Sequence, residues 1–539
     1  MLARVKNLFG NLAIYGLGDV ATSLVSLLLL PVYTRYLTPS DYGVIAMLLT
    51  IEAIAKVALR WGVDTAFMRL YYDCADHVAR QRLASTLFFF LLGANGSLVL
   101  AGIASAGWLS ERIFGSTEHG LLIGLVLANS FVTGFYFIPF QVMRIGERSG
   151  QFIALVFARS AGTLLVRLVL VVWAGMGVLG VVVADVMVTA VFTPILGIWF
   201  RPLLRPMFSL TVIRAALGFG LPRIPHSIAN QAIGLADRYF LNAYGSLRDV
   251  GLYSIGASFG LAPKLFLSAF ESAWTPFFLG VMREPDAKRI YSTVSTYALA
   301  APVLIVAALA AAAHDLVRLT TTEQFHGAAA VTPWIALGVM FQGVYVVGSI
   351  GLVITKRTAF YPLATGSAAA VSLLANAFLI PRYGLLGAAF ANAVAYGTLA
   401  VVTVGFSWRV YPIRYEWSRL LRIAVAGLAG YLAANWMVPL SMPPLSGLFL
   451  RTAVTGATYL GVLYFTGFFH AGELRMLKEV RQRALQRRTS RLPVPDTSQV
   501  EMAGEIVAGA PDPTLDSVET ESSSPSGPDV TPRSQSPRR

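Results

Sequence analysis

Charged residues and cysteine are scarce in this chain. Only 13% of its 539 residues are Asp, Glu, Lys or Arg, whereas a soluble domain averages about 25%. The single cysteine, Cys74, leaves no intramolecular disulfide and no cysteine cluster that could hold a metal. The six histidines are scattered, and no GxxxxGK(S/T) nucleotide-binding loop is present. We therefore expect no metal, no cofactor and no ATP-driven transport by this chain alone.

Apolar residues dominate instead: 56% of the chain is hydrophobic and the mean hydropathy is +0.64. Apolar windows of roughly 20 residues recur along most of the length, enough to cross a hydrocarbon core of about 30 Å. The windows are long and uniform, which predicts helices rather than barrel strands. We predict an all-α polytopic membrane protein of about fourteen spans, at 11–32, 42–62, 83–107, 119–143, 151–173, 177–200, 215–243, 249–279, 290–313, 328–354, 358–380, 384–408, 420–438 and 448–469.

The basic residues of the loops predict the orientation, because cytoplasmic loops carry more Lys and Arg. With a cytoplasmic N-terminus, and the C-terminal tail left out, the cytoplasmic side carries nineteen: Arg4, Lys6, Arg69, Arg80, Arg82, Arg144, Arg148, Arg201, Arg205, Arg214, Arg283, Lys288, Arg289, Lys356, Arg357, Arg409, Arg414, Arg419 and Arg422. The opposite side carries six: Arg35, Arg112, Arg248, Arg318, Arg382 and Arg451. We therefore predict that both termini are cytoplasmic. The net charge of +14 then reflects topology and a membrane surface rather than nucleic-acid binding.

Two pairs of segments indicate an internal repeat. GVLGVVVADVMV (177–188) matches GLLGAAFANAVA (384–395), and YLTPSDYGVIA (36–46) matches YGSLRDVGLYS (244–254), at nearly the same offset and in the same order. The paired residues include Gly177 with Gly384, Asp185 with Asn392, Asp41 with Asp249 and Gly43 with Gly251. This predicts two parallel six-helix repeats about an axis along the membrane normal. Such repeats suit a carrier that rocks two bundles around a central site. A duplication without alternating access is the alternative.

The repeat and the composition of the tail predict five parts. Residues 1–208 and 209–415 form the N-terminal and C-terminal six-helix lobes, and 416–470 add two transmembrane helices. Residues 471–491 form a basic cytoplasmic helix on the inner leaflet. Residues 492–539 are rich in Pro, Ser, Thr, Asp and Glu and are expected to be disordered.

Four charged residues, Glu52, Lys56, Arg60 and Asp64, recur at every fourth position inside or at the end of the second span. An ionisable group near the bilayer centre costs about 2.5–3.5 kcal/mol on insertion scales. Residues four apart lie on one face of a helix. The four therefore predict one polar stripe that faces a cavity or another helix. Arg60 and Asp64, near the end of the span, could instead extend to the interface.

Polar residues also lie in spans 1, 7 and 8. Spans 1 and 2 of the first half correspond to spans 7 and 8 of the second half. These polar residues are Asp19, Arg223, His226, Asn230, Gln231, Asp237, Arg238, Lys264 and Glu271, and Lys264 aligns with Lys56. Four prolines are expected to kink spans 7 and 8: Pro222, Pro225, Pro263 and Pro276. Together these residues predict a central, hydrated, partly cationic cleft between two bundles. Ion pairing alone, or a structural pair at Asp237 and Arg238, is the alternative.

Three segments resemble the Wzx-type polysaccharide-biosynthesis flippases of bacteria, in the multidrug/oligosaccharidyl-lipid/polysaccharide exporter superfamily. They are LLPVYTRYLTPSDYGVIAML (29–48), LGFGLPRIPHSIANQAIGLADRYFLNAYGSLRDVGLYSIG (217–256) and NAFLIPRYGLLGAAFANAVAY (376–396). The resemblance implies fourteen helices, with two six-helix lobes that form a V. It also implies transport, not catalysis: movement of an undecaprenyl-pyrophosphate-linked oligosaccharide from the cytoplasmic to the periplasmic leaflet of the bacterial inner membrane, for exopolysaccharide or O-antigen assembly.

The resemblance further implies that cations in the cavity bind the pyrophosphate and that polar groups bind the sugars. Asp237 and Arg238 match the family's motif in span 7 and carry over as substrate-binding candidates. Lys56, Arg60, Arg223 and Lys264 are our candidates from depth and charge, since guanidinium and ammonium groups suit phosphate oxygens. Candidates for proton or sodium coupling are Asp19, Glu52, His226 and Glu271. The implied partners are the lipid-linked glycan, membrane lipids and a polysaccharide polymerase or export machinery.

Two other function classes remain in view. A cation-coupled multidrug antiporter of the same superfamily would need a site dominated by carboxylates and aromatic residues, and the excess of basic groups argues modestly against it. A membrane glycosyltransferase, polymerase or ligase would need a large outer loop for its chemistry. The longest predicted outer loop, residues 314–327, is short, and its histidines and carboxylates are those expected of a solvated loop.

Overall fold

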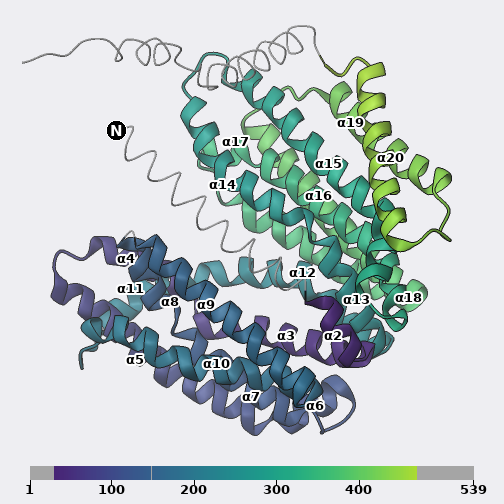
Figure 1. Ribbon diagram of the computed structural model, residues 1–539. Coiled ribbons are helices and arrows are strands. Elements are labelled where there is room, and N and C mark those ends of the chain that lie inside the picture. The colour runs from purple at the N-terminus through teal and green to yellow at the C-terminus, as the bar shows by residue number, and fades with distance from the viewer. Residues whose placement is uncertain (1–28, 147, 470–539) are drawn as a thin grey trace, which may run out of the picture. The chain divides into compact units, whose positions relative to one another are not determined.

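The computed structural model describes residues 29–146 and 148–469, in which every regular element is a helix (Figure 1). The elements are α2 (Leu30–Tyr36), α3 (Pro39–Arg60), α4 (Val63–Asp73), α5 (His77–Ala104), α6 (Ala106–Phe114), α7 (Gly120–Gly134), α8 (Phe137–Ile145), α9 (Ser149–Leu168), η1 (Val169–Trp173), α10 (Gly177–Phe200), η2 (Arg201–Leu203), α11 (Leu210–Gly220), η3 (Leu221–Arg223), α12 (Ile224–Tyr244), α13 (Leu247–Gly260), α14 (Pro263–Val281), α15 (Ala287–Thr320), η4 (Glu323–Ala330), α16 (Thr332–Gly348), α17 (Ile350–Ile354), α18 (Phe360–Val410), α19 (Trp417–Met437) and α20 (Pro444–Phe465).

Ten of the described helical segments are long and apolar enough to cross a membrane, or eleven if the bent pair α13 and α14, at 47°, counts as one span. This confirms the predicted all-α multi-pass membrane protein. The 51 residues of α18 would extend about 77 Å at ~1.5 Å per residue, far more than one bilayer crossing needs. Gly384 interrupts that helix with φ 51° and ψ −125°, a conformation that suits glycine. Two predicted spans, 358–380 and 384–408, therefore lie within α18.

The predicted span 215–243 does not appear as a single long helix. The segment 215–243 is divided between α11, η3 and α12, at the point where Pro222 and Pro225 are expected to kink it. Most of the segment 11–32 lies outside the described residues, as do the predicted basic helix and disordered tail. The count of fourteen spans therefore stays a prediction.

The predicted polar stripe is not carried by one continuous helix. After Arg60 the backbone turns through left-handed conformations at Trp61 (φ 50°) and Gly62 (φ 67°), and α4 begins at Val63. Buried Asn95 of α5 holds this turn: its Oδ1 accepts the Trp61 Nε1–H at 2.9 Å, and its Nδ2 donates to the carbonyl oxygen of Leu59 at 2.7 Å. The stripe is therefore divided between α3 and α4, because a buried amide satisfies the polar groups at the break.

A second expectation, a solvated outer loop at 314–327, is wrong. Helix α15 continues to Thr320 and η4 begins at Glu323, so nearly all of that segment is helical. Asp315 is 1% exposed and forms an ion pair inside the protein.

The repeated motifs at 36–46 and 244–254 start two helices that pack against each other, α3 and α13. Each begins with a capping box, in which a hydroxyl and a carboxylate satisfy free N–H groups of the first turn: Thr38 with Asp41, and Ser246 with Asp249. The paired glycines allow the two backbones to touch. A Cβ on Gly43 would overlap the carbonyl oxygen of Leu247, and one on Gly251 would overlap that of Pro39. Because Pro39 and Leu247 are themselves repeat partners, the contact is symmetric.

The second repeated motif also keeps its local structure. Gly177 and Gly384, which the alignment pairs, both have positive φ, at 54° and 51°. Each precedes a helical segment in which a further paired glycine, Gly180 or Gly387, lies against nearby backbone. The same local geometry at paired positions accords with the repeat that the sequence indicates.

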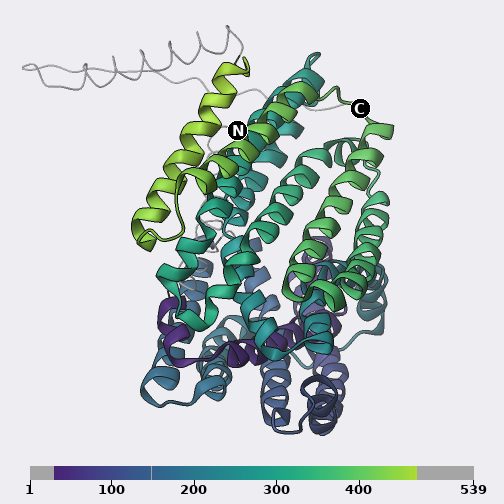
Figure 2. The ribbon, with the colours of Figure 1, turned by 90° about the vertical axis from the view of Figure 1, so that its right-hand side faces the viewer.

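Helices α19 and α20 lie side by side, as Figures 1 and 2 show, and both contact α15. A fully buried ion pair holds α20: Arg451 Nε donates to Asp315 Oδ2 at 2.8 Å, and both side chains are 1% exposed. The remaining guanidinium nitrogens of Arg451 donate to Asn435 Oδ1 and to the carbonyl oxygen of Val438. The sequence counts Arg451 among the basic residues of the outer side, and it lies within α20. A charge buried this deeply is tolerated because it is paired and all three of its guanidinium nitrogens donate hydrogen bonds.

We predict that Gly251→Ala destabilises the protein. Alanine favours a helix over glycine by roughly 1 kcal/mol, but here its methyl group would force the backbones of α3 and α13 apart. Overpacking of this kind costs about 1–3 kcal/mol. Thermal unfolding of the purified protein in detergent measures the change in Tm.

Gly162→Ala in α9 is the matched control, because nothing lies within 4 Å of the place that its methyl group would take. Its Tm should stay level or rise slightly. Equal Tm values for the two variants would contradict the close contact of α3 and α13.

Candidate functional site

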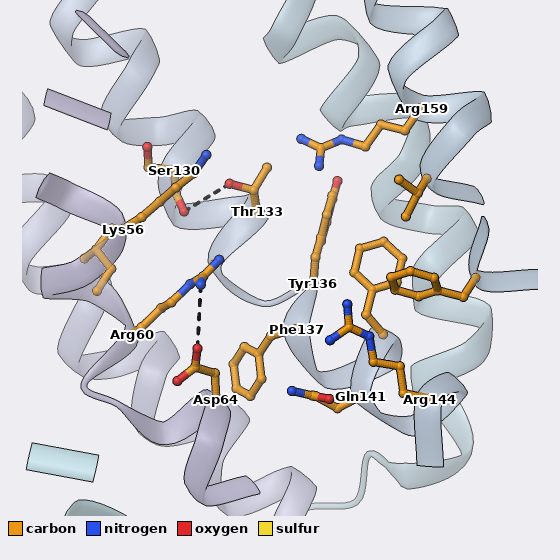
Figure 3. Close-up of a pocket in the computed structure, with 15 residues that line it drawn as sticks. Lys56, Arg60, Asp64, Ser130, Thr133, Tyr136, Phe137, Gln141, Arg144 and Arg159 are labelled. Carbon is orange, nitrogen blue, oxygen red and sulfur yellow. Dashed lines mark hydrogen bonds and ion pairs between the residues drawn. The ribbon is translucent and has the colours of Figure 1, made fainter. Parts of the chain in front are cut away.

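Lys56 and Arg60, in the last two turns of α3, line a cavity of about 300 Å³ (Figure 3). The opposite wall comes from α7, α8 and α9. Figure 3 shows Lys56 and Arg60 on one side and Arg144 and Arg159 on the other. We call this space the cationic cavity; its polar lining residues are Lys56, Arg60, Asp64, Ser130, Thr133, Gln141, Arg144 and Arg159.

Cations outnumber anions around this cavity. Among the described residues, four basic side chains line it, Lys56, Arg60, Arg144 and Arg159, against one carboxylate, Asp64. Its volume reaches the lower end of the range of small-ligand pockets, about 300–1,000 Å³. A space with this excess of positive charge favours an anion.

Arg159 is held toward the cavity by an aromatic ring rather than by a carboxylate. Its guanidinium carbon lies 5.1 Å from the ring centroid of Tyr136. Tyr136 is buried, and α10 fixes it: its hydroxyl donates to the carbonyl oxygen of Thr189 at 3.0 Å and lies 2.8 Å from Thr193 Oγ1. Stacking uses the face of the guanidinium and leaves its N–H edges free for acceptors.

Two lining polar atoms add to this environment. Ser130 Oγ and Gln141 Oε1 are buried and have no hydrogen-bond partner in the described structure. Buried polar atoms are normally paired with protein or with a bound molecule. Their presence beside the cations is consistent with a polar ligand.

The cations of the stripe each have a nearby carboxylate. Lys56 Nζ lies 2.5 Å from Glu52 Oε1, and Arg60 Nη1 lies 3.6 Å from Asp64 Oδ2. The side chains of Lys56 and Arg60 are 39% and 46% exposed. Ion pairs this exposed are weak, commonly about 0.3–0.5 kcal/mol for helix neighbours. An incoming anion can therefore replace either carboxylate at small cost.

Lys56 and Arg60 also line a second space, of about 310 Å³, between α3 and α12. Glu52 lines this space, and Gln231 closes it from α12, where its Nε2 donates to the carbonyl oxygen of Ala53 at 3.5 Å. Lys56 and Arg60 thus lie between two spaces. One is the cationic cavity, within the first half of the chain, and the other is the space between α3 and α12.

Three sequence-predicted residues lie on exposed positions away from the two cavities that Lys56 lines. Arg223 ends η3, and its guanidinium lies 5.5 Å from the ring centroid of Phe219. Lys264 is exposed in the first turn of α14, because α13 ends at Gly260 and Pro263 starts a new helix. Glu271 is exposed on the same helix. Lys264 therefore does not occupy a position equivalent to that of Lys56, although the two align in sequence.

Asp237 and Arg238 form a buried pair within the packing of α12 and α13. Asp237 is 2% exposed, and its carboxylate accepts hydrogen bonds from the Tyr253 hydroxyl and from Arg238, whose Nη1 lies 3.2 Å from Oδ1. Arg238 Nη1 also donates to the carbonyl oxygen of Gly234 at 3.0 Å. This geometry favours the structural alternative over substrate binding.

His226 joins α12 to α18. Its Nδ1 lies 2.9 Å from Thr365 Oγ1, and its Nε2 lies 3.1 Å from Asn230 Nδ2. Both ring nitrogens are therefore engaged. Asp19, the remaining candidate for ion coupling, lies outside the described residues.

The far wall of the cationic cavity goes beyond the sequence prediction. The sequence places Arg144 only among the loop cations, and Arg159 lies within the predicted span 151–173. Arg167, in the same helix as Arg159, instead forms a bidentate ion pair with Asp185 of α10, at 2.6 Å for the shorter contact. The feature of the sequence that could have singled out Arg159 is its position inside an apolar span, where charged residues are rare and often functional. Its distance from Lys56 depends on helix packing.

Comparison with known proteins gives consistent results. A profile of the family described as polysaccharide biosynthesis proteins matches residues 32–330, more than half of the chain. The chain is 24% identical over 293 residues to the Lsg locus putative protein 1 of Haemophilus influenzae strain KW20/Rd, a match that covers 51% of this chain and 67% of that relative.

Two solved structures have a similar fold. The lipid II flippase MurJ, in an inward closed conformation, matches with a TM-score of 0.66 at 14% identity, over 84% of this chain and 98% of MurJ. An inward-facing multidrug resistance MATE family transporter of the MOP superfamily matches with a TM-score of 0.56 at 12% identity, over 73% of this chain and 95% of the transporter. At these identities the likeness concerns the fold.

We predict stability effects of different size for two kinds of site residue. Asp237→Asn should lower the Tm markedly, because breaking a buried ion pair costs about 3–5 kcal/mol. Lys56→Ala should change the Tm little, because its pair with Glu52 is only partly buried, with side chains 39% and 19% exposed. Thermal unfolding in detergent measures both. A Tm for Asp237→Asn equal to that of the wild type would rule out the structural role.

Proposed function

The chain belongs to the family of polysaccharide biosynthesis proteins, and from this premise we propose that it is a flippase that moves a lipid-linked oligosaccharide across the bilayer. The observation that carries the proposal is the excess of basic groups in the cationic cavity. A lipid-linked oligosaccharide has a phosphate or pyrophosphate between its lipid and its sugars. That group is the part of the substrate that most needs compensating charge inside a membrane.

Each cation has a distinct role in this proposal. Arg159, stacked on Tyr136, presents two N–H donors in a fixed direction and suits bidentate contact with phosphate oxygens. Lys56 and Arg60 exchange their carboxylate partners for the phosphate. Ser130 and Gln141 supply further hydrogen bonds. The sugars then lie toward the space between α3 and α12, which Gln231 lines.

The finer assignment follows the family resemblance. The substrate is an undecaprenyl-pyrophosphate-linked oligosaccharide, moved from the cytoplasmic to the periplasmic leaflet of a bacterial inner membrane by alternating access. Both termini face the cytoplasm. A polysaccharide polymerase or export machinery receives the product. Four further residues are proposed to contact the substrate only in conformations that differ from the described one. They are Arg223, Lys264, Asp237 and Arg238.

Glu52 offers a route for ion coupling. When a phosphate binds Lys56, Glu52 loses its partner at 2.5 Å. Carboxylates inside transporters commonly serve as ion-coupling groups, so Glu52 can then take up a proton or a sodium ion. Substrate binding and ion binding are thereby linked.

We predict that Lys56→Ala, Arg60→Ala and Arg159→Ala each reduce flipping roughly tenfold or more. Each removes a charge-assisted contact with the phosphate, worth about 1.5–3 kcal/mol. Lipid-linked repeat units trapped on the inner leaflet, with loss of surface polysaccharide at matched protein levels, measure the effect in cells.

Arg112→Ala is the control, because Arg112 also stacks on an aromatic ring, that of Trp108 at 5.9 Å, but does not line the cationic cavity. It should keep normal polysaccharide. Normal polysaccharide in all three cavity variants would remove the cavity assignment.

We predict that Glu52→Gln uncouples movement from ion gradients. Reconstituted Glu52→Gln protein should still bind the lipid-linked substrate but should lose the acceleration that an imposed proton or sodium gradient gives the wild type. The same assay on Asp19→Asn, His226→Gln and Glu271→Gln tests the other candidates. Unchanged gradient dependence in Glu52→Gln would exclude Glu52 as the coupling group.

The second candidate function is a cation-coupled multidrug antiporter. The fold similarity to a MATE family transporter and the carboxylates of Glu52 and Asp185 favour it. A null strain with a normal glycan but increased drug sensitivity would support this function and contradict the flippase.

A further inference from the structure

A cavity of about 780 Å³ lies at one end of the first half of the chain, apart from the cationic cavity. The ends of α4, α8 and α10 and the start of α5 surround it. Two arginines line it, Arg80 and Arg148, so we call it the Arg80–Arg148 cavity. In the proposed orientation it faces the cytoplasmic interface.

The charged residues that line this cavity in the described part of the chain are basic. Arg80 and Arg148 line it with His77, and no described Asp or Glu does. The nearby carboxylate of Asp76 is engaged elsewhere, because it caps α5 by accepting the Ala79 N–H at 2.6 Å. Arg80 Nε is buried and has no hydrogen-bond partner in the described structure.

Aromatic rings fix the direction of both guanidinium groups. The guanidinium carbon of Arg80 lies 5.0 Å from the ring centroid of Tyr71, and that of Arg148 lies 5.4 Å from the ring centroid of Trp199. Stacking occupies the faces and leaves the N–H edges available. Two oriented forks of this kind suit the oxygens of a phosphate.

The rest of the lining is largely apolar, and it includes Val142, Met143 and Leu203. A free inorganic phosphate would gain nothing from such a surface. A phospholipid would, because its acyl chains bury against it while its phosphate meets the arginines. Tyrosine and tryptophan are also the residues that favour the membrane interface.

Buried hydrogen bonds hold one wall of the cavity in place. Gln81 Nε2 donates to the carbonyl oxygen of Pro202 at 2.9 Å, and Ser85 Oγ donates to that of Leu203 at 3.0 Å. The N–H of Arg205 donates to the same Ser85 hydroxyl at 2.8 Å. Gln81 and Ser85 are both buried. The connection after α10 is thus fastened to α5, and these hydrogen bonds fix that wall of the cavity.

We propose that the Arg80–Arg148 cavity binds the phosphate of an anionic phospholipid of the surrounding leaflet. This lipid is a resident of the protein and is separate from the transported one. The site does not depend on the proposed transport function, since it needs only a bilayer that contains anionic phospholipid.

The test is a titration of the purified full-length protein in detergent, followed by native mass spectrometry. The two lipids are phosphatidylglycerol and phosphatidylcholine with the same acyl chains. Wild type should bind phosphatidylglycerol more tightly. Arg80→Gln and Arg148→Gln should each weaken that binding roughly tenfold, the effect of losing one charge-assisted hydrogen bond.

Arg112→Gln is the matched control, a stacked arginine on α6 that does not line this cavity, and it should bind like the wild type. If Arg80→Gln fails to fold, Arg148→Gln tests the site alone, because Arg148 is exposed at the start of α9. Unchanged phosphatidylglycerol affinity in Arg148→Gln overturns the proposal.

Two competitors identify other occupants. If inorganic phosphate displaces phosphatidylglycerol at equal concentration, the cavity binds a free anion, and the assignment to a phospholipid is wrong. If a polyprenyl pyrophosphate binds there more tightly than phosphatidylglycerol, the cavity belongs to the transported lipid, and the assignment to a resident lipid is wrong.

Discussion

The contact between the first turns of α3 and α13 is the constraint on which the rest of the arrangement depends. Two backbones meet there without side chains between them, because Gly43 and Gly251 each face a carbonyl group of the other helix. In a membrane, helices are not driven together by water, and close packing of small residues supplies much of the attraction. The capping boxes at Thr38 and Ser246 fix where each helix starts. A short rigid junction of this kind sets the directions of both helices.

The position of the cationic cavity follows from that junction. Helix α3 extends about 33 Å from its start, at ~1.5 Å per residue over 22 residues. Lys56 and Arg60 therefore lie near its far end, where α7, α8 and α9 surround them on one side and α12 approaches on the other. The turn at Trp61, held by Asn95, redirects the chain into α4. Charged residues at the end of a fixed helix can face a cavity without being buried in the apolar core.

The protein holds its arginines in two different ways. Arg451 is buried and paired with Asp315, and each of its three guanidinium nitrogens donates a hydrogen bond within the protein, so it joins helices. Arg159, Arg80 and Arg148 are instead stacked on aromatic rings, with no carboxylate in ion-pairing contact in the described structure. A stacked guanidinium keeps its direction and its hydrogen-bond donors. The difference separates structural arginines from those suited to bind an anion.

Much of the fold and part of the site could be predicted from the sequence, because hydropathy, helical period and capping are local properties. The apolar windows predicted the helices, the paired glycines predicted the repeat, and the four-residue spacing placed Glu52, Lys56 and Arg60 on one face. Only the tertiary structure decided which cations share a cavity. Arg159 meets Lys56 there, while Lys264 does not, because Pro263 starts a new helix. Distances between helices depend on which surfaces pack together, and that information is not contained in the spacing along any one helix.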